Sequence, residues 1–345
     1  MHWNIKDTPL KETTAHLIEC LGVDAVVAQL LAQRGITTFE EARAFFRPHI
    51  GQLHDPFLMQ DMDKAVGRLQ QAINQKEAVM VYGDYDVDGT TSVSLLTHFL
   101  RSQGLDVTPY IPDRYAEGYG LSKKGIDTAK AANISLMIAL DCGVKAIEQV
   151  AYAKTLGIEL IICDHHTPAD VLPDALAVLD PKRGDCTYPF KELCGCGVGF
   201  KLMQGLLQQQ GKEVNEIIAY LDFVAVAIAA DIVPMVGENR ALAFLGLQQL
   251  NTNPRPGLKA LMRDKQTGQI ISDVVFGMTP RINAAGRMKH GLNAVELLLS
   301  ASDEEAKKRA QEVETYNSSR REVEQEITKE ALAQIVENEE ENNAA

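Results

Sequence analysis

The sequence predicts an α/β fold in which helices flank a mostly parallel β-sheet. From about residue 61 to residue 180, apolar segments of strand length alternate with helical segments, which is typical of consecutive βαβ units. Several apolar segments end directly in an acidic residue or a histidine, and ligand-binding groups of open α/β sheets gather at the carboxyl ends of the strands. These segments are residues 136–140, 160–163, 175–179 and 223–230.

The first 55 residues are predicted to form a helical extension. Residues 25–32 are rich in apolar helix-forming side chains, and Thr38 with Glu41 forms a capping box at the start of a further helix. We expect this extension to pack against the rest of the chain rather than to take part in chemistry.

Residues 56–300 are predicted to form the main domain, with a sheet up to about residue 185 and a helical cap after it. Helical segments are expected at 199–210, 214–230 and 240–250. The run 223–230 is wholly apolar and ends in Asp231. Its length fits either a buried strand or a buried helix. We expect the helical part to carry Asp231 to one end of the sheet.

Residues 301–345 are predicted to form a long connector helix and an acidic tail. Ser302 and Glu305 form a second capping box, and neither Pro nor Gly follows before about residue 336. Polar residues 317–320 interrupt the apolar stripe midway, so much of this helix is expected to lack a packing face within the chain. The stripe residues are Ala306, Ala310, Val313, Val323 and Ile327.

The composition is that of a cytoplasmic protein with a sizeable core. Hydrophobic residues make up 46% of the 345 residues. The polar start resembles no secretion signal, and no apolar run is long enough to cross a membrane. Six cysteines in a chain of this size do not make a disulfide framework. We expect free thiols, including Cys194 and Cys196, whose one-residue spacing does not match a zinc knuckle.

The net charge of −13 argues against a protein that coats nucleic acid without specificity, because neutralising phosphates requires Lys and Arg. A local cationic groove stays compatible with it, since acid is concentrated in the C-terminal tail and metal ions would neutralise clustered carboxylates. The basic residues expected in the C-terminal third are Arg255, Lys259, Arg263, Arg281, Arg287, Lys289 and His290.

Three carboxylates follow the first apolar run at every second position. If extended geometry continues, Asp84, Asp86 and Asp88 point to one side. Such a cluster resists burial, and Mg²⁺ or Mn²⁺ would relieve that cost. Gly89 would then allow a tight turn, with the hydroxyl groups of residues 90–92 capping the next helix. An acidic surface turn is the alternative, whereas an EF-hand is excluded because no Glu closes the loop.

Further acidic segments follow the later apolar runs. A single Asp after a strand is usually a turn or cap residue, but the joint occurrence of several, with a His-His pair among them, indicates a metal site. His98, on the helix after the first acidic segment, is expected to pack rather than to bind metal. The segments are Asp141-Cys-Gly143, Asp164-His165-His166, Asp180-Pro181 and Asp231.

The content and order of these motifs resemble the DHH phosphoesterase superfamily. Residues 83–89, 141–143 and 164–166 are similar to its first three motifs, and residues 230–234 are similar to the fourth. Two more segments, 112–120 and 279–287, resemble the RecJ family of single-strand-specific 5′→3′ DNA exonucleases. The resemblance runs from about residue 46 to the C-terminus.

The resemblance implies a centre of two Mn²⁺ or Mg²⁺ ions that hydrolyses phosphodiester bonds. Two such ions activate a water molecule and stabilise the departing oxygen. Asp164 would fix the tautomer of His165, and His166 would reach the scissile phosphate. The ligands assigned to one ion are Asp86, Asp141 and Asp231, with Asp84 as an additional ligand, and those assigned to the other are Asp88, Asp141, His165 and Asp231.

The resemblance also implies single-stranded DNA as the substrate, degraded to 5′-mononucleotides in DNA repair and recombination, with a helicase and a single-strand-binding protein as partners. Arg114 would bind the 5′-terminal phosphate, and Tyr115 or Tyr119 would stack a base. Stabilisation of loops and helix ends is the alternative role. Phosphate contacts are assigned to Arg281, Asn283 and Arg287.

Two other functions stay open. One is a phosphodiesterase of short oligonucleotides or cyclic dinucleotides, or a pyrophosphatase, against which segments 112–120 and 279–287 argue. The other is a nuclease-dead scaffold, against which the intact acidic and histidine positions argue. In the RecJ family the long helix leads to a DHH-associated domain. The chain ends before a domain of that kind, so we expect a shortened form.

Overall fold

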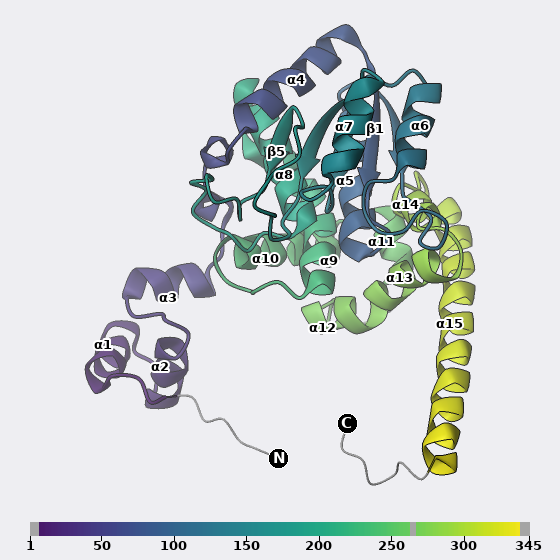
Figure 1. The fold of residues 1–345 in the computed structure, drawn as a ribbon. Coiled ribbons are helices and arrows are strands. Elements are labelled where there is room, and N and C mark those ends of the chain that lie inside the picture. The colour runs from purple at the N-terminus through teal and green to yellow at the C-terminus, as the bar shows by residue number, and fades with distance from the viewer. Residues whose placement is uncertain (1–6, 263–266, 339–345) are drawn as a thin grey trace.

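The computed structural model describes residues 7–262 and 267–338 and confirms the predicted α/β fold. Five parallel strands form one sheet in the order β2-β1-β3-β4-β5 (Figure 1). The strands are β1 Ala78–Gly83, β2 Asp106–Tyr110, β3 Leu136–Leu140, β4 Glu159–Cys163 and β5 Ala177–Leu179. The sequence did not single out β2, an edge strand that is only partly buried.

The central strands are buried on both faces, which explains why they read as continuous apolar runs. On β1, Val79 and Val81 enter the core cluster on one face, while Met80 and Tyr82 enter the cluster on the other. Because side chains alternate along a strand, one apolar run fills both layers.

Helices cover both faces of the sheet (Figure 1). One face packs against α4, α5 and α8, and the other packs against α6 and α7. The bounds are α4 Met62–Gln75, α5 Val87–Ser102, α6 Lys123–Ala131, α7 Ile147–Thr155 and α8 Gly195–Gln209.

The apolar run before Asp231 is a helix, α9 Leu221–Asp231, and not a strand. Residues 221–229 are all buried, as expected for a helix that is apolar on every side. The other elements of this helical part are η3 Val214–Tyr220, α10 Gly237–Thr252, α11 Pro256–Leu261, α12 Ile271–Asp273, η4 Val274–Met278, α13 Thr279–Met288 and α14 Leu292–Leu298.

The N-terminal extension has its own small core of Leu17, Ala28 and Leu31. The Thr38–Glu41 capping box is present as predicted. Arg240 of α10 joins the extension to the main body: its guanidinium lies 3.6 Å from the centre of the Phe45 ring, and its Nε donates to the Phe45 carbonyl at 2.7 Å. The elements are α1 Lys11–Leu21, α2 Ala25–Ala32, α3 Phe39–Phe46, η1 Ile50–Gln52 and η2 Pro56–Leu58.

The long C-terminal helix, α15 Asp303–Glu337, is present as predicted, and the Ser302 hydroxyl caps its start. Ala306 and Val313 are buried in the core, whereas Ile327 and Leu332 in the second half are exposed. Figure 1 shows the second half projecting away from the sheet. The division of the chain at residues 55 and 300 remains a prediction.

A buried ion pair ties α8 to α10. Lys201 lies 3.2 Å from Glu238, both side chains are fully buried, and the Tyr188 hydroxyl donates to the same carboxylate at 2.7 Å. Lys201 also donates to the carbonyl of His54 at 2.6 Å. This network positions α8, whose first turn contributes to the site described below.

All six cysteines are free, as predicted. No helix in the described ranges is both long and apolar enough to cross a membrane.

Candidate functional site

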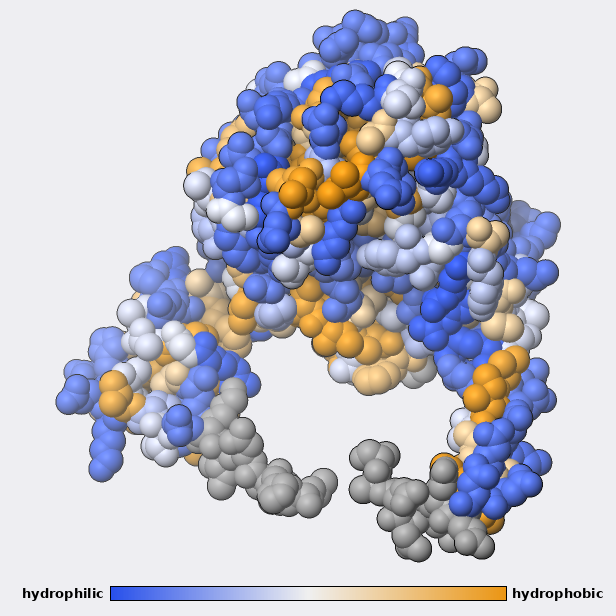
Figure 2. Space-filling view, in the orientation of Figure 1, coloured by the Kyte–Doolittle hydropathy of each residue, from blue (hydrophilic) through white to orange (hydrophobic). Residues whose placement is uncertain are grey.

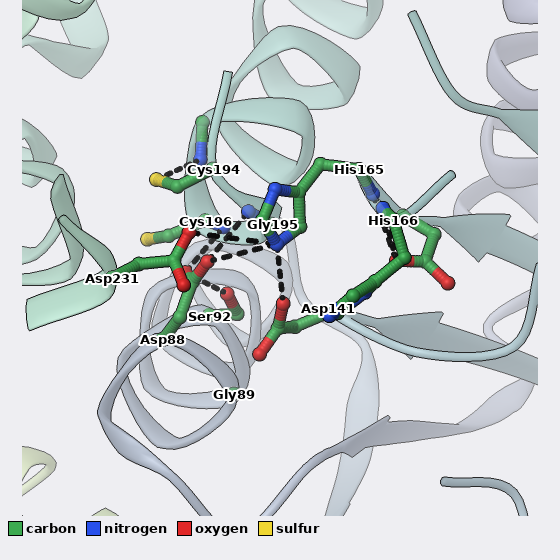
Figure 3. A network of polar contacts seen from close by, with 12 residues as sticks. Asp88, Gly89, Ser92, Asp141, His165, His166, Cys194, Gly195, Cys196 and Asp231 are labelled. Carbon is green, nitrogen blue, oxygen red and sulfur yellow. Dashed lines mark hydrogen bonds and ion pairs between the residues drawn. The ribbon is translucent and has the colours of Figure 1, made fainter. Parts of the chain in front are cut away.

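Acidic and histidine side chains from four segments meet at the carboxyl edge of the sheet (Figure 3). Asp84 directly follows β1, Asp141 directly follows β3, and His165 is the second residue after β4. Asp231 is the last residue of α9, which brings a fourth segment to the same place. Parallel strands end at the same edge, so residues far apart in sequence converge there.

The first acidic segment does not continue as a strand. β1 ends at Gly83, and α5 begins at Val87 with Asp86 as its N-cap, accepting from the Gly89 N–H at 2.9 Å. Asp88 therefore lies in the first helical turn. Gly89 is helical rather than part of a tight turn, and a Cβ there would lie 2.3 Å from the Asp84 carbonyl oxygen. The expectation of a turn and of capping by residues 90–92 was wrong, because the helix starts earlier.

Backbone N–H groups at the start of α8 hold Asp88. Gly195 donates to its Oδ2 at 2.6 Å and Cys196 donates to its Oδ1 at 2.8 Å. Asp88 is 1% exposed. These donors fix both carboxylate oxygens in a direction that faces the other acids (Figure 3).

Asp141 adopts a left-handed backbone conformation, with φ +60°. Its N–H donates to the Cys163 carbonyl at 2.9 Å, which extends the pairing of β3 and β4 by one residue. The Gly195 backbone packs directly against it, and a Cβ at position 195 would lie 2.6 Å from the Asp141 Cβ. Strain of this kind, in a buried residue, is typical of functional sites.

His165 is the centre of the arrangement. Its Nε2 lies 3.1 Å from Asp141 Oδ1, 3.6 Å from Asp231 Oδ2 and 3.8 Å from Asp88 Oδ2. Two groups of possible metal-ligand atoms share this residue: one contains Asp141 and His166, the other Asp88 and Asp231. Neither ring nitrogen of His165 has a hydrogen-bond partner in the described part of the chain.

The sequence analysis expected Asp164 to orient the ring of His165. In the structure, Asp164 orients the ring of His166 instead. Its Oδ1 lies 2.7 Å from His166 Nδ1, and it contacts His165 only through the backbone N–H of that residue, at 2.8 Å. Its Oδ2 accepts from the Val144 N–H. The other ring nitrogen of His166, Nε2, lies 3.3 Å from the Tyr119 hydroxyl. The result is a line from Asp164 through His166 to Tyr119.

The charges of this site are strongly perturbed. Burial, reinforced by neighbouring carboxylates, raises the pKa of Asp84 to about 7, of Asp88 to about 8 and of Asp231 to about 6. The pKa of Asp141 is raised well above its usual value by burial and then by Asp88. Burial lowers the pKa of His165 to about 4, so that this imidazole is neutral.

The donor set fits divalent cations. Carboxylate oxygens crowd around a neutral imidazole, and a bound cation would relieve both their repulsion and their desolvation. Asp84 Oδ1 is buried without a hydrogen-bond partner, as are both ring nitrogens of His165. Oxygen donors with one imidazole suit Mn²⁺ and Mg²⁺ better than metals that prefer thiolates.

We expect the metal-free protein to lose thermal stability as the pH rises from about 5 to about 8. The pKa values of Asp231, Asp84 and Asp88 lie above their ordinary values, so in this range the folded chain binds more protons than the unfolded chain. Stability is therefore lost as the pH rises through about 6, 7 and 8.

With Mn²⁺ the trend should reverse, because ligands must be deprotonated to bind. Melting temperatures across this pH range, in chelator and in Mn²⁺, check the prediction. In chelator, Asp84→Asn should make the melting temperature depend less on pH. Melting temperatures that change with pH in the same way in chelator and in Mn²⁺ would contradict the prediction.

The predicted substrate residues lie beside the site but differ in their freedom to bind. Arg281 forms an ion pair with Glu314 of α15 at 2.6 Å and donates to the Leu261 carbonyl. Its guanidinium is therefore not free to bind a DNA phosphate, contrary to the expectation from the sequence. Arg287 is exposed, and Asn283 is half-buried.

The predicted loop 112–120 lies against the metal-site segment. The exposed Arg114 guanidinium lies 4.9 Å from the centre of the Tyr85 ring, and Tyr119 meets the same ring edge to face. The Tyr115 hydroxyl donates to the Arg287 carbonyl at 3.2 Å, which joins this loop to α13. A Cβ on Gly286 would lie 2.5 Å from the Tyr85 carbonyl oxygen, so α13 approaches the site closely.

Sequence reasoning missed three contributors to the site. Gly195 and Cys196 act through their backbone, and the glycine-rich start of α8 was the signal for such donors. Lys182 is close enough to lower the pKa of both His165 and Asp231. Asp180 is fully buried beside this segment, where burial raises its pKa to about 7.

Three cations of the predicted basic groove, including Arg281, are paired with acids. Arg255 pairs with the buried Asp222 at 2.7 Å, and Lys259 pairs with Asp303. Arg263 lies outside the described residues. His98 lies against Tyr220, consistent with a packing role.

Comparison with known proteins agrees with this site. The DHH family, N-terminal domain, matches residues 78–228. A single-stranded-DNA-specific exonuclease RecJ of Bacillus subtilis (strain 168) is 40% identical over 97% of this chain and 42% of its own length. A crystal structure of exonuclease RecJ bound to manganese superposes with a TM-score of 0.74 at 32% identity, covering 82% of this chain and 71% of the other.

RecJ of Thermus thermophilus in complex with Mn²⁺ superposes with a TM-score of 0.82 at 28% identity, covering 95% of this chain and 47% of the other. The parallel sheet and the acid–histidine cluster at its carboxyl edge thus define a DHH-type domain. Within that class, the chain belongs to the RecJ family. It spans about half the length of the curated relatives it matches.

Proposed function

We propose that this chain is the catalytic part of a metal-dependent, single-strand-specific 5′→3′ DNA exonuclease that releases 5′-mononucleotides and acts in repair and recombination. The position of His165 supports this most directly, because oxygens of Asp88, Asp141 and Asp231 surround its Nε2 within 3.8 Å, beside the further acids Asp84 and Asp86. Two adjacent cation sites are the arrangement that phosphodiester hydrolysis uses.

Mn²⁺ or Mg²⁺ would be held by the carboxylates that surround His165. Asp88, Asp141 and Asp231 all place an oxygen within 3.8 Å of its Nε2, in support of their assignment to one ion. Asp84 and Asp86, with Asp141 and Asp231, are proposed for the second, since the charge of Asp86 raises the pKa of these neighbours. Bound ions supply Lewis acidity and a nucleophilic water at neutral pH.

His166 is proposed to hold the scissile phosphate. The hydrogen bond to Asp164 raises its pKa, so it favours the cationic form that attracts a phosphate oxygen. Burial disfavours the charged form of Asp164, but hydrogen bonds from His166 and from backbone N–H groups outweigh it, and its pKa lies below the usual value. Asp164 thus fixes both the orientation and the charge of His166. A phosphate oxygen would replace the Tyr119 hydroxyl at Nε2.

The strand is proposed to lie between loop 112–120 and α13. Arg114 and Arg287 are exposed on these two elements, which the Tyr115 hydroxyl joins. Arg114 is assigned to the 5′-terminal phosphate and Tyr119 to stacking on a base. Arg287 and Asn283 are assigned to internal phosphates. Arg281 takes a structural part through Glu314.

The proposal extends to a cytoplasmic location and to a helicase and a single-strand-binding protein as partners. Its support is membership of the RecJ family and the proposed substrate, because a helicase produces single-stranded DNA and a single-strand-binding protein covers it. The dependence of the cleavage rate on strand length distinguishes this function from the small-substrate alternative. A phosphodiesterase of short oligonucleotides would slow sharply on longer strands.

Single strands labelled at either end provide the test. With Mn²⁺, we expect mononucleotides to be released from the 5′ end, while blunt duplexes of the same sequence stay intact. Chelation should abolish the reaction. Release of a 3′ label first, or equal cleavage of the duplex, would overturn the assignment.

A further inference from the structure

Ile232, the residue directly after Asp231, has an unfavourable conformation. Its backbone is left-handed, with φ +57° and ψ 31°. A β-branched side chain is poorly tolerated in that region, because its Cβ substituents crowd the backbone. The side chain is nevertheless 85% exposed, so packing within the chain does not compensate for the strain.

The turn itself does not require isoleucine. A left-handed residue ends α9 so that Asp231 stands at the helix end, and glycine or asparagine fulfils that role at lower cost. Ile232 is the single apolar member of the non-glycine residues with positive φ in the described ranges. Those residues are Asp61, Lys76, Asn133, Asp141 and Ile232. The described fold therefore gives no role to the isoleucine side chain, and a contact with a bound molecule would account for it.

An apolar surface leads away from this position. Val236 on the same loop is 51% exposed, and Phe244 of α10 is 40% exposed. Met235, Phe244 and Ile270 line a common hollow of about 250 Å³. Figure 2 shows apolar side chains gathered on the lower edge of the α/β body, around α9 and α12. Met235, which lines the hollow, follows the proposed metal ligand Asp231 by four positions in the chain.

We infer that Ile232 contacts a nucleobase of the single strand beside the scissile phosphate and so positions the strand for cleavage. The inference rests on the proposed function. The metal centre and the cations take the phosphates, which leaves the apolar face of a base without a partner. An exposed, apolar side chain held rigidly at the edge of the centre covers such a face. Duplex DNA, whose bases are already stacked, offers no such face.

Ile232→Gly removes the side chain and relieves the strain together. We expect its melting temperature to rise by about 1–3 °C, its KM for single-stranded DNA to rise about fivefold or more, and its kcat to stay within about twofold. Lys76→Gly is the matched control. It is a left-handed residue after α4, exposed and at the opposite edge of the sheet. It should show the same stabilisation with an unchanged KM.

Oligonucleotides with one abasic position, placed in turn at each of the first nucleotides from the 5′ end, test the base contact itself. One position should raise the KM of the wild type and have no further effect on Ile232→Gly. Additive losses at every position, or a wild-type KM in Ile232→Gly, would overturn the inference. Failure of the wild type to degrade single strands would instead overturn the proposed function.

Discussion

Asp141→Asn is expected to lower the rate of phosphodiester cleavage by at least about 10³-fold. Asparagine keeps the shape of the side chain but removes the charge that a cation requires, and Asp141 Oδ1 is the carboxylate atom nearest to His165 Nε2, at 3.1 Å. The same change should raise the melting temperature in chelator, because burial and Asp88 disfavour the charged form of this carboxyl. Cleavage rates and melting curves of the two proteins measure both effects.

Asp180→Asn is the control for Asp141→Asn. Asp180 is also fully buried and also has a raised pKa, but it belongs to neither group of ligand atoms. We expect it to keep its activity within about tenfold and to keep the stabilisation that Mn²⁺ gives the wild type. Wild-type activity in Asp141→Asn, or an equal loss in both variants, would remove Asp141 from the metal centre.

Gly195→Ala is expected to lower activity by about 10²-fold, although it adds one methyl group to a residue with no functional side chain. The new Cβ would lie 2.6 Å from the Cβ and 2.8 Å from the Cα of Asp141, and backbone does not yield as a flexible side chain does. Either Asp141 or the start of α8 must move, and the latter carries the N–H groups that hold Asp88. Kinetics with varied Mn²⁺ should show weakened metal activation as well as a lower kcat.

Gly197→Ala lies two residues further along the same helix and is the matched comparison. The atoms nearest to its Cβ would be those of the Leu193 side chain and Cys194 Sγ, at 3.4 Å or more, which is ordinary contact. Since alanine favours helix over glycine by about 1 kcal/mol, we expect full activity and equal or higher stability. If both alanine variants lost activity alike, damage to α8 in general would explain the loss better than a clash with Asp141.

The strands were predictable where burial is complete. β1, β3, β4 and β5 are continuous apolar runs because helices cover both faces of the sheet. β2 escaped prediction because it lies at the sheet edge, where only Val107 of its five residues is buried. The run before Asp231 fitted either a helix or a strand. A fully buried segment is apolar at every position, so the spacing of its apolar residues does not distinguish the two.

The acidic segment 84–88 shows why spacing alone misled. Alternating carboxylates fit a strand, but the same residues fit a helix start, with Asp86 as N-cap and Asp88 in the first turn. The choice depends on the contacts of Asp88 with Gly195 and Cys196, more than a hundred positions away. The role of Asp164 was misassigned for a related reason, since its ring partner depends on how the chain turns after β4.

The sequence by itself determined the fold class, the acids and histidines of the site and the family, because apolar runs and ordered motifs are local signals. The tertiary structure alone decided which groups meet and which charges are already satisfied. Glu314 of α15 occupies Arg281, and the α8 backbone completes the site around Asp88 and Asp141. Ile232 emerged only from its φ angle and its exposure. Such facts depend on non-local packing and backbone conformation, which no local pattern of residue types records.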